Sequence, residues 1–281
     1  MQLPRWLYYR IYPGAGPDAI DHLIARIVPH ALERCTSDLW FFVRYLDSRG
    51  FHLRLRIQTG DTGRTAWAQK IVDPILRDWV AELNQTATSG PRGKVGIDLA
   101  RYDPETENFG PTGVSIAERV FHASSEAAIQ VLRDESEGKC ARRLVSLLLM
   151  QLVADAFVLN EPWSGFWKRY AKYWLIREKS AEIDEWNRRF RAKASELVSR
   201  DDSAFLSEQA FSEQLRNSLT SWRGTLTRAA AEYASLDEPQ ARRPGYLAFY
   251  FIHLMNNRLG ILPLSEAWLA TVLAEQFGRA A

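Results

Sequence analysis

The stretch that decides the fold is DLWFFVRYLDSRGFHLRLRIQ, residues 38–58. Two runs rich in aromatic, Leu, Val and Ile residues flank a short polar segment, Asp47-Ser48-Arg49-Gly50. This composition is typical of two antiparallel strands joined by a tight turn. We therefore expect a β-hairpin over these residues.

The second run of the hairpin predicts a strand with one apolar and one basic face, because successive side chains of a strand point to opposite sides. Leu53, Leu55 and Ile57 share the apolar face, and the basic face carries His52, Arg54 and Arg56.

The position of Arg44 depends on the turn. With a three-residue loop and Gly50 in the left-handed conformation, Asp47 pairs with Phe51 and Arg44 lies opposite Arg54. Like charges directly opposite each other destabilise a sheet. Three arginines and a histidine on one patch therefore indicate an anionic ligand, or negative charge that develops during a reaction. The alternative is a solvated outer face of an antiparallel sheet.

Working outward, residues 1–110 alternate between strand and helix patterns. Residues 5–12 and 94–102 predict strands, and residues 17–35 and 65–83 carry apolar side chains at helical spacing. Pro29 predicts a kink in the first of these helices. The expected fold class is α+β, with a mainly antiparallel sheet flanked by helices in this half.

Residues 111–281 predict helices and no strands. Ser115 and Glu118 have the spacing of a capping box, with the serine at the helix N-terminus. The chain contains no internal repeat and no low-complexity linker. We expect a single domain over residues 1–281, with a sheet-rich half (1–110) and a helical half (111–281).

The last informative stretch is YLAFYFIHLMNNRL, residues 246–259, followed by Gly260 as an expected C-terminal cap. Spacings of four, three and four residues place Tyr246, Tyr250, His253 and Asn257 on one helix face. The other faces are almost wholly apolar. Two interpretations have about equal weight: a hydrogen-bonded core histidine, or a polar stripe that lines a cavity. In the second case His253 could transfer protons near neutral pH.

Composition excludes several classes of function. The net charge is +2, which gives no general attraction to nucleic acid or to a membrane surface. Two cysteines, Cys35 and Cys140, form neither a disulfide framework nor a zinc set. The longest apolar runs are too short to span a bilayer. We expect a cytoplasmic protein with no metal, no cofactor, no nucleic-acid partner and no membrane partner.

Several segments together resemble a known family. In chain order they are WLYYRIYPG (6–14), WFFVRYLDSRGFHLRLRI (40–57), YDPETENFGP (102–111), SIAERVFHASSEAAIQVL (115–132) and FIHLMNNRLG (251–260). They resemble the C-terminal domain of lantibiotic dehydratases, which also occurs alone as the thiopeptide-type bacteriocin biosynthesis protein. The resemblance spans nearly the whole chain.

The resemblance implies action on a ribosomally made precursor peptide, beside other biosynthetic enzymes. In full-length dehydratases this domain eliminates glutamate from glutamylated Ser or Thr. Stand-alone relatives include split eliminases. They also include thiopeptide pyridine synthases, which join two dehydroalanines in a formal aza-[4+2] cycloaddition and expel water and the leader peptide.

Position 108 favours the second activity. Eliminating members use an arginine of the HxRxR strand, an arginine in an ERYGG-like segment and the histidine of the late helix. The resemblance maps the first onto Arg56 or Arg54 and the last onto His253. Asn108 stands where the second arginine is expected. Losing this charge is expected to cost a few kcal/mol of transition-state stabilisation for glutamate elimination.

We therefore expect a macrocyclase that forms a pyridine ring. The expected catalytic residues are His253, Tyr250, Tyr246 and Arg56, and the expected substrate-binding residues are Arg44, His52, Arg54, Asn108 and Asn257. The alternatives are a glutamate-elimination subunit of a split dehydratase, and a non-catalytic subunit that captures the leader peptide by adding a strand to the hairpin edge.

Overall fold

The structure is a computed structural model. It describes residues 5–14, 16–35, 37–86, 95–158, 162–176, 185–186, 188–193 and 211–279. Among the helices within these ranges, none is long and apolar enough to cross a lipid bilayer.

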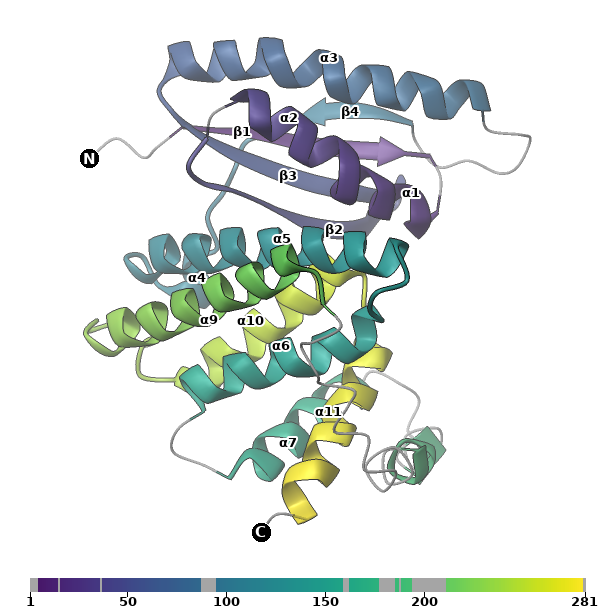
Figure 1. Ribbon diagram of the computed structural model, residues 1–281. Coiled ribbons are helices and arrows are strands. Elements are labelled where there is room, and N and C mark those ends of the chain that lie inside the picture. The colour runs from purple at the N-terminus through teal and green to yellow at the C-terminus, as the bar shows by residue number, and fades with distance from the viewer. Residues whose placement is uncertain are drawn as a thin grey trace.

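A four-stranded antiparallel sheet forms the N-terminal part (Figure 1). Its strands are β1 (Arg5–Pro13), β2 (Trp40–Asp47), β3 (Gly50–Gly60) and β4 (Val95–Leu99), in the order β2-β3-β1-β4. Helices α1 (Pro17–His22), α2 (Val28–Cys35) and α3 (Thr62–Thr86) lie against one side of it. Leu53, Leu55 and Ile57 of β3 are fully buried there.

The expected hairpin is confirmed, but its register is not. Asp47 pairs with Gly50, and Arg44 pairs with Leu53. The turn therefore holds two residues, with Gly50 at a φ of 120°. Because directly paired residues share a face, Arg44 lies on the apolar side of the sheet with Leu53, away from Arg54. The expected cationic patch loses one of its arginines.

The first helix is irregular one turn earlier than expected. A π-helical segment, η1 (Leu23–Ile27), separates α1 from α2. Pro29 has no N–H to donate to the carbonyl four residues back, which belongs to Ala25. Nε of Arg133 donates to that carbonyl instead, at 2.8 Å. The helix is thus underwound around the Ala25 carbonyl, which has no helical donor at Pro29 and bonds Arg133 instead.

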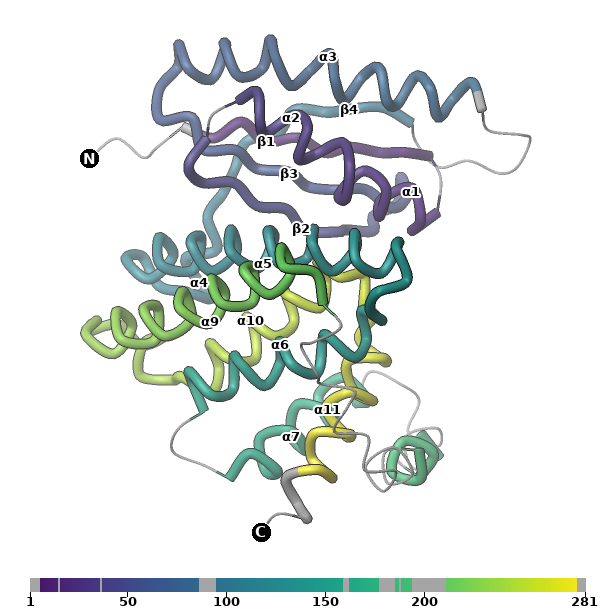
Figure 2. Tube along the Cα trace, viewed as in Figure 1, coloured from purple at the N-terminus to yellow at the C-terminus, as the bar shows by residue number. Residues whose placement is uncertain are grey.

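The rest of the described chain is helical, which confirms the expected α+β class. The helices are α4 (Thr106–Phe109), α5 (Gly113–Ser136), α6 (Arg142–Phe157), α7 (Trp163–Leu175), α9 (Glu213–Ala234), α10 (Pro244–Leu259) and α11 (Pro263–Arg279). Figure 2 shows α3 at one end of the molecule and α7 with α11 at the other. The buried apolar side chains of both halves form one contiguous cluster. We propose on this ground that residues 1–281 fold as one unit.

α10 is the central helix of the helical half. It packs against α5, α6, α11 and β2. Gly260 ends it in the left-handed conformation, with a φ of 76°, as the sequence predicted. A Cβ at this position would lie 3.0 Å from Nη1 of Arg44. Glycine therefore permits both the left-handed cap conformation and the close approach of the Arg44 side chain.

Side chains from two helices cover the outer edge of β2. Oγ of Ser125 accepts from the Phe42 N–H at 3.3 Å. Nδ1 of His122 lies 2.8 Å from the Trp40 carbonyl. Asn257 accepts from the Arg44 N–H at 2.8 Å and donates to its carbonyl at 2.9 Å. These groups occupy the positions at which an added strand would bind. Capture of a leader peptide by strand addition along residues 40–44 is therefore excluded.

The N-terminus of α5 is capped by a distant residue and not by the expected box. The helix begins at Gly113, and the side chain of the N-cap residue, Thr112, makes no capping bond. The carboxylate of Glu238 accepts from the Thr112 N–H at 2.8 Å and from the Gly113 N–H at 3.2 Å. Glu118 is buried inside the helix and accepts from the Tyr102 hydroxyl. Local spacing could not reveal this acid, because Glu238 lies 126 residues after Thr112 in the sequence.

Replacing Glu238 with Gln tests this cap. Partial burial acts to raise the pKa of Glu238, but hydrogen bonds from Thr112 and Gly113 lower it below its ordinary value. Because the folded-state pKa is lowered, the carboxylate stabilises the protein above the unfolded pKa and loses this effect as pH falls through the folded pKa. We expect E238Q to lose about 1 kcal/mol of unfolding free energy at neutral pH, with a smaller difference in acid.

Urea denaturation at several pH values measures this loss. Asp237→Asn is the matched control, because Asp237 is 89% exposed. A constant difference between E238Q and the unmodified protein from neutral pH into acid would contradict the charged cap.

Candidate active site

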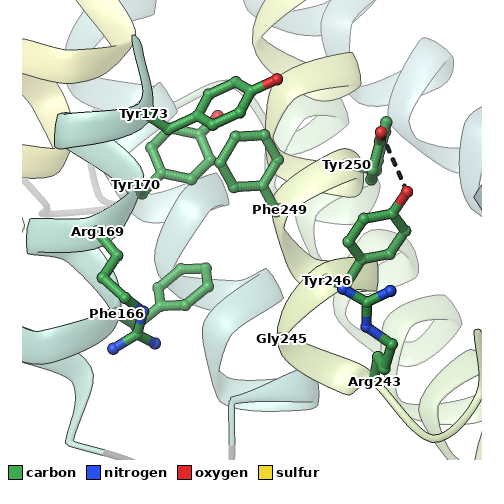
Figure 3. A pocket seen from close by; sticks show the side chains of 9 residues that line it. All are labelled: Phe166, Arg169, Tyr170, Tyr173, Arg243, Gly245, Tyr246, Phe249 and Tyr250. Atoms are coloured by element: carbon green, nitrogen blue, oxygen red, sulfur yellow. Dashed lines mark hydrogen bonds between the residues drawn. The ribbon is translucent and has the colours of Figure 1, made fainter. Parts of the chain in front are cut away.

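A cleft of about 460 Å³ lies between α7 and α10 (Figure 3). Most of its walls are aromatic. The lining side chains are Phe166, Arg169, Tyr170 and Tyr173 from α7, together with Arg243, Tyr246, Phe249 and Tyr250 at and along α10. Such a surface suits a peptide that carries planar groups, because aromatic side chains provide large apolar contact areas.

Two of the expected catalytic residues line this cleft. Oη of Tyr246 lies 3.2 Å from Oη of Tyr250 and 3.3 Å from Oδ1 of Asn108. Burial and the contact with Tyr246 raise the pKa of Tyr250 to about 12. The phenol of Tyr250 is therefore protonated near neutral pH and can donate a hydrogen bond to a substrate. Asn108 also donates to the carboxyl group of Glu105 at 3.3 Å, so the position where an arginine was expected holds an amide that bonds an acid and a phenol.

His253 lies one turn beyond Phe249 on α10. Its Nδ1 lies 3.0 Å from Oε1 of Glu266, and its side chain is 28% exposed. The ring of Trp174 lies against it, with ring centroids 4.5 Å apart. Trp174 also stacks on Phe249. The imidazole thus extends the aromatic wall of the cleft and keeps one nitrogen, Nε2, for an exposed partner.

Arg56 is held in a box of aromatic rings. Its guanidinium lies 4.7 Å from the ring centre of Tyr8 and 5.3 Å from those of Phe41 and Tyr102. The residue is 8% exposed, and within the described ranges its Nε has no hydrogen-bond partner. Burial lowers its pKa. A buried guanidinium with an unused donor is suited to bind an oxygen atom that carries negative charge.

Arg258 is a second buried arginine beside Arg56. It is 1% exposed, and its Nε donates to Oγ of Ser125 at 3.1 Å. Burial, reinforced by the positive charge of Arg56, lowers its pKa to about 9. The sequence interpretation treated this residue only as part of the helix end, so the neighbouring cation was missed.

His52 and Arg54 share the face of the sheet opposite α1–α3, as expected. Nε of Arg54 donates to Nε2 of His52 at 3.2 Å, and its guanidinium lies 3.3 Å from the ring centre of Tyr45. His52 is fully buried, and burial lowers its pKa. This neutral imidazole positions Arg54 from within the sheet.

Arg44 and Asn257 are brought together, but by structural contacts. The amide of Asn257 is fully used by the backbone of Arg44, as described for the β2 edge. The Arg44 guanidinium pairs with Asp21 at 2.5 Å and donates to the Arg258 carbonyl at 2.9 Å. Neither side chain lines the cleft.

The candidate residues thus form two groups. Tyr246, Tyr250 and His253 lie on or beside the cleft, whereas Arg56, Arg54 and His52 lie on the sheet. The cleft lining contains no residue of the hairpin. Sequence reasoning missed Arg169 and Arg243, which line the cleft. It also missed Glu266, whose partners His253 and Tyr170 lie on other helices. Within the part of the chain that the structure describes, no cluster of His, Cys, Asp or Glu has the composition of a metal site.

The sequence matches the family model of the lantibiotic biosynthesis dehydratase C-terminal region over residues 6–277. The chain belongs to this family. No curated protein matches it in sequence.

Solved structures share the fold. The tRNA-dependent lantibiotic dehydratase MibB from Microbispora sp. 107891 matches with a TM-score of 0.64 and 21% identity, over 100% of this chain and 29% of MibB. The pyridine synthase TbtD from thiomuracin biosynthesis matches with a TM-score of 0.69 and 19% identity, over 98% of this chain and 99% of TbtD. TsrL matches with a TM-score of 0.65 and 14% identity, over 98% of this chain and 94% of TsrL.

Replacing Asn257 with Ala tests whether this residue is structural. The change removes two hydrogen bonds to the β2 edge and leaves buried backbone groups without partners, so we expect a loss of about 2 kcal/mol in unfolding free energy. Chemical denaturation measures it. Asn217→Ala, at an exposed position of α9, should leave stability within about 0.5 kcal/mol. Unchanged stability in Asn257→Ala would return this residue to the substrate-binding set.

Proposed function

We propose that this protein is a thiopeptide macrocyclase that forms a pyridine ring from two dehydroalanines of a precursor peptide. The observation that carries the proposal is the neutral network of Asn108, Tyr246 and Tyr250 at an aromatic cleft. A carboxylate substrate bound at Asn108 would meet an amide and two phenols, with the side chain of Glu105 beside them. The shared fold with TbtD, over nearly all of both chains, supports the same choice.

The proposed reaction requires proton transfers but no redox chemistry. The amide between one dehydroalanine and the preceding residue shifts to its imidic acid form, and its C=N bond and the adjacent C=C bond make an azadiene. This azadiene adds to the second dehydroalanine through two new carbon–carbon bonds. Loss of the hydroxyl as water, then of the leader peptide as its carboxamide, leaves the aromatic pyridine. Electrons balance without an oxidant.

Proton donors and acceptors for these steps lie together on α10. In the proposal Tyr246 and Tyr250 donate hydrogen bonds to the reacting amide, and His253 moves the protons that accompany loss of water and leader. Arg56 polarises an amide oxygen through its unused donor. The two dehydroalanines of the peptide must be held close together. Binding in the cleft orders them in advance, so that the reaction step itself carries no further entropic cost.

The remaining expected residues have secondary roles in the proposal. Arg54, positioned by His52, binds an acidic segment of the leader. Asn108 orients Tyr246. Arg44 and Asn257 hold β2 against α10 and act only through that position. The free thiols of Cys35 and Cys140 fit the reducing cytoplasm in which precursor peptides are modified, and other biosynthetic enzymes would supply the dehydroalanines.

Glutamate elimination is the second candidate, and one observation favours it. Arg169 and Arg243 both line the cleft, and two arginines are able to bind the carboxylate of a glutamyl ester. Arg243 already lies 4.6 Å from the ring centre of Tyr246. The proposed synthase uses the same arginines to bind the leader.

Mass spectrometry of a purified precursor that contains dehydroalanines and azoles distinguishes the candidates. We expect a macrocycle together with a free leader carboxamide. Release of glutamate from a glutamylated peptide, with no macrocycle, would replace the synthase with the eliminase. Tight leader binding without turnover of either peptide would support the non-catalytic subunit.

Replacing His253 with Phe tests the proton-transfer role. We expect macrocycle formation to fall by about 10²–10⁴-fold, while circular dichroism shows an unchanged fold. His30→Phe, at an exposed position of α2, is the matched control and should retain full activity. Full activity in His253→Phe would remove this residue from the mechanism.

A further inference from the structure

A buried acid that the proposed reaction does not use lies behind His253. Glu266, in the first turn of α11, has no exposed side-chain surface. Its Oε1 lies 3.0 Å from Nδ1 of His253, and its Oε2 accepts a short hydrogen bond from the Tyr170 hydroxyl. Three helices, α7, α10 and α11, each contribute one member to this cluster.

Burying the Glu266 carboxyl group costs folding free energy, and an apolar side chain would fill the same space without that cost. An unpaired carboxylate in a protein interior is strongly unfavourable, so such groups are retained where they are paired and hydrogen-bonded. Burial raises the pKa of Glu266, and the bonds from His253 and Tyr170 oppose this effect. The amide of Asn256, whose Oδ1 accepts from Ser146, opposes it as well.

The cluster has a defined direction of hydrogen bonding. Burial and the neighbouring carboxylate raise the pKa of Tyr170 far above its ordinary value, so the phenol keeps its proton and must donate to Glu266. The other oxygen, Oε1, then accepts from Nδ1–H of His253. The ring of Trp174 lies against the imidazole and restricts its rotation. Nε2 is the nitrogen left for the substrate.

We infer that Glu266 is a positioning residue: with Tyr170 it fixes the orientation of His253, so that Nε2 is the nitrogen that donates a proton to the substrate. The inference rests on the proposed function for the identity of the acceptor, which is the departing hydroxyl or leader nitrogen. The coupling between Glu266 and His253 does not depend on that function. In the donation step the proton moves from Nε2 to the leaving atom, and the neutral imidazole keeps its Nδ1–H bond to Glu266.

Titration of His253 by NMR tests the coupling directly. The chain has 5 histidines, so ¹⁵N-labelled histidine gives few signals, and His253→Gln assigns the one in question. In Glu266→Gln the negative charge is lost and the shape is kept. We expect the titration midpoint of His253 to fall by about one pH unit or more, and the decline of macrocycle formation with rising pH to move to lower pH by the same amount.

Two further variants make the test specific. Tyr170→Phe removes the donor to Glu266 and makes the carboxylate more basic, so the midpoint of the coupled pair should rise. Glu275→Gln changes another acid on the same helix, at a partly exposed position, and should leave the midpoint unchanged.

The outcomes separate this inference from the proposed function. An unchanged His253 midpoint in Glu266→Gln overturns the inference even if the protein makes pyridine. If Glu266→Gln does not fold, an unchanged midpoint in Tyr170→Phe overturns it. Shifted midpoints in a protein that makes no macrocycle support the coupling and count against the proposed function alone.

Discussion

The structure depends on how the exposed edge of one strand is closed. β2 lies at one edge of the sheet. The backbone groups that point away from β3 would otherwise lack hydrogen-bond partners in the protein interior. Ser125 from α5 and Asn257 from α10 replace the missing neighbouring strand. Since these bonds are directional, they set where α10 lies along the sheet, and they do so more strictly than apolar packing alone.

The placement of α10 in turn sets the candidate active site. One end of the helix is tied to the sheet through Asn257, and the other end presents Tyr246 and Tyr250 to the cleft. His253 lies between them, where α7 and α11 approach. A polar stripe that the sequence showed as one line therefore divides into a structural end at Asn257, the proposed proton-transfer residue His253, and two phenols that line the cleft.

Much of the fold could be predicted from periodicity. Strict alternation in β3 identified the sheet, and the four-three-four spacing on α10 identified its polar face. The hairpin register was wrong because two- and three-residue turns both accept Gly50 with positive φ. Glu238 and Glu266 were missed for a different reason. Glu238 lies between α9 and α10 and caps α5, and Glu266 of α11 contacts His253 of α10, so only the folded chain brings the partners together.

The π-helical segment has a consequence for the angular phase of the first helix. Each residue of an α-helix advances the side-chain direction by about 100°. One additional residue in a widened π-helical turn therefore rotates the side chains of α1 about the helix axis relative to those of α2. Asp21 precedes this segment and forms ion pairs with Arg44 and Arg142. Regular winding would turn Asp21 away from both. The π-helical segment Leu23–Ile27 thus sets the direction of Asp21, so that one carboxylate joins β2 to the start of α6.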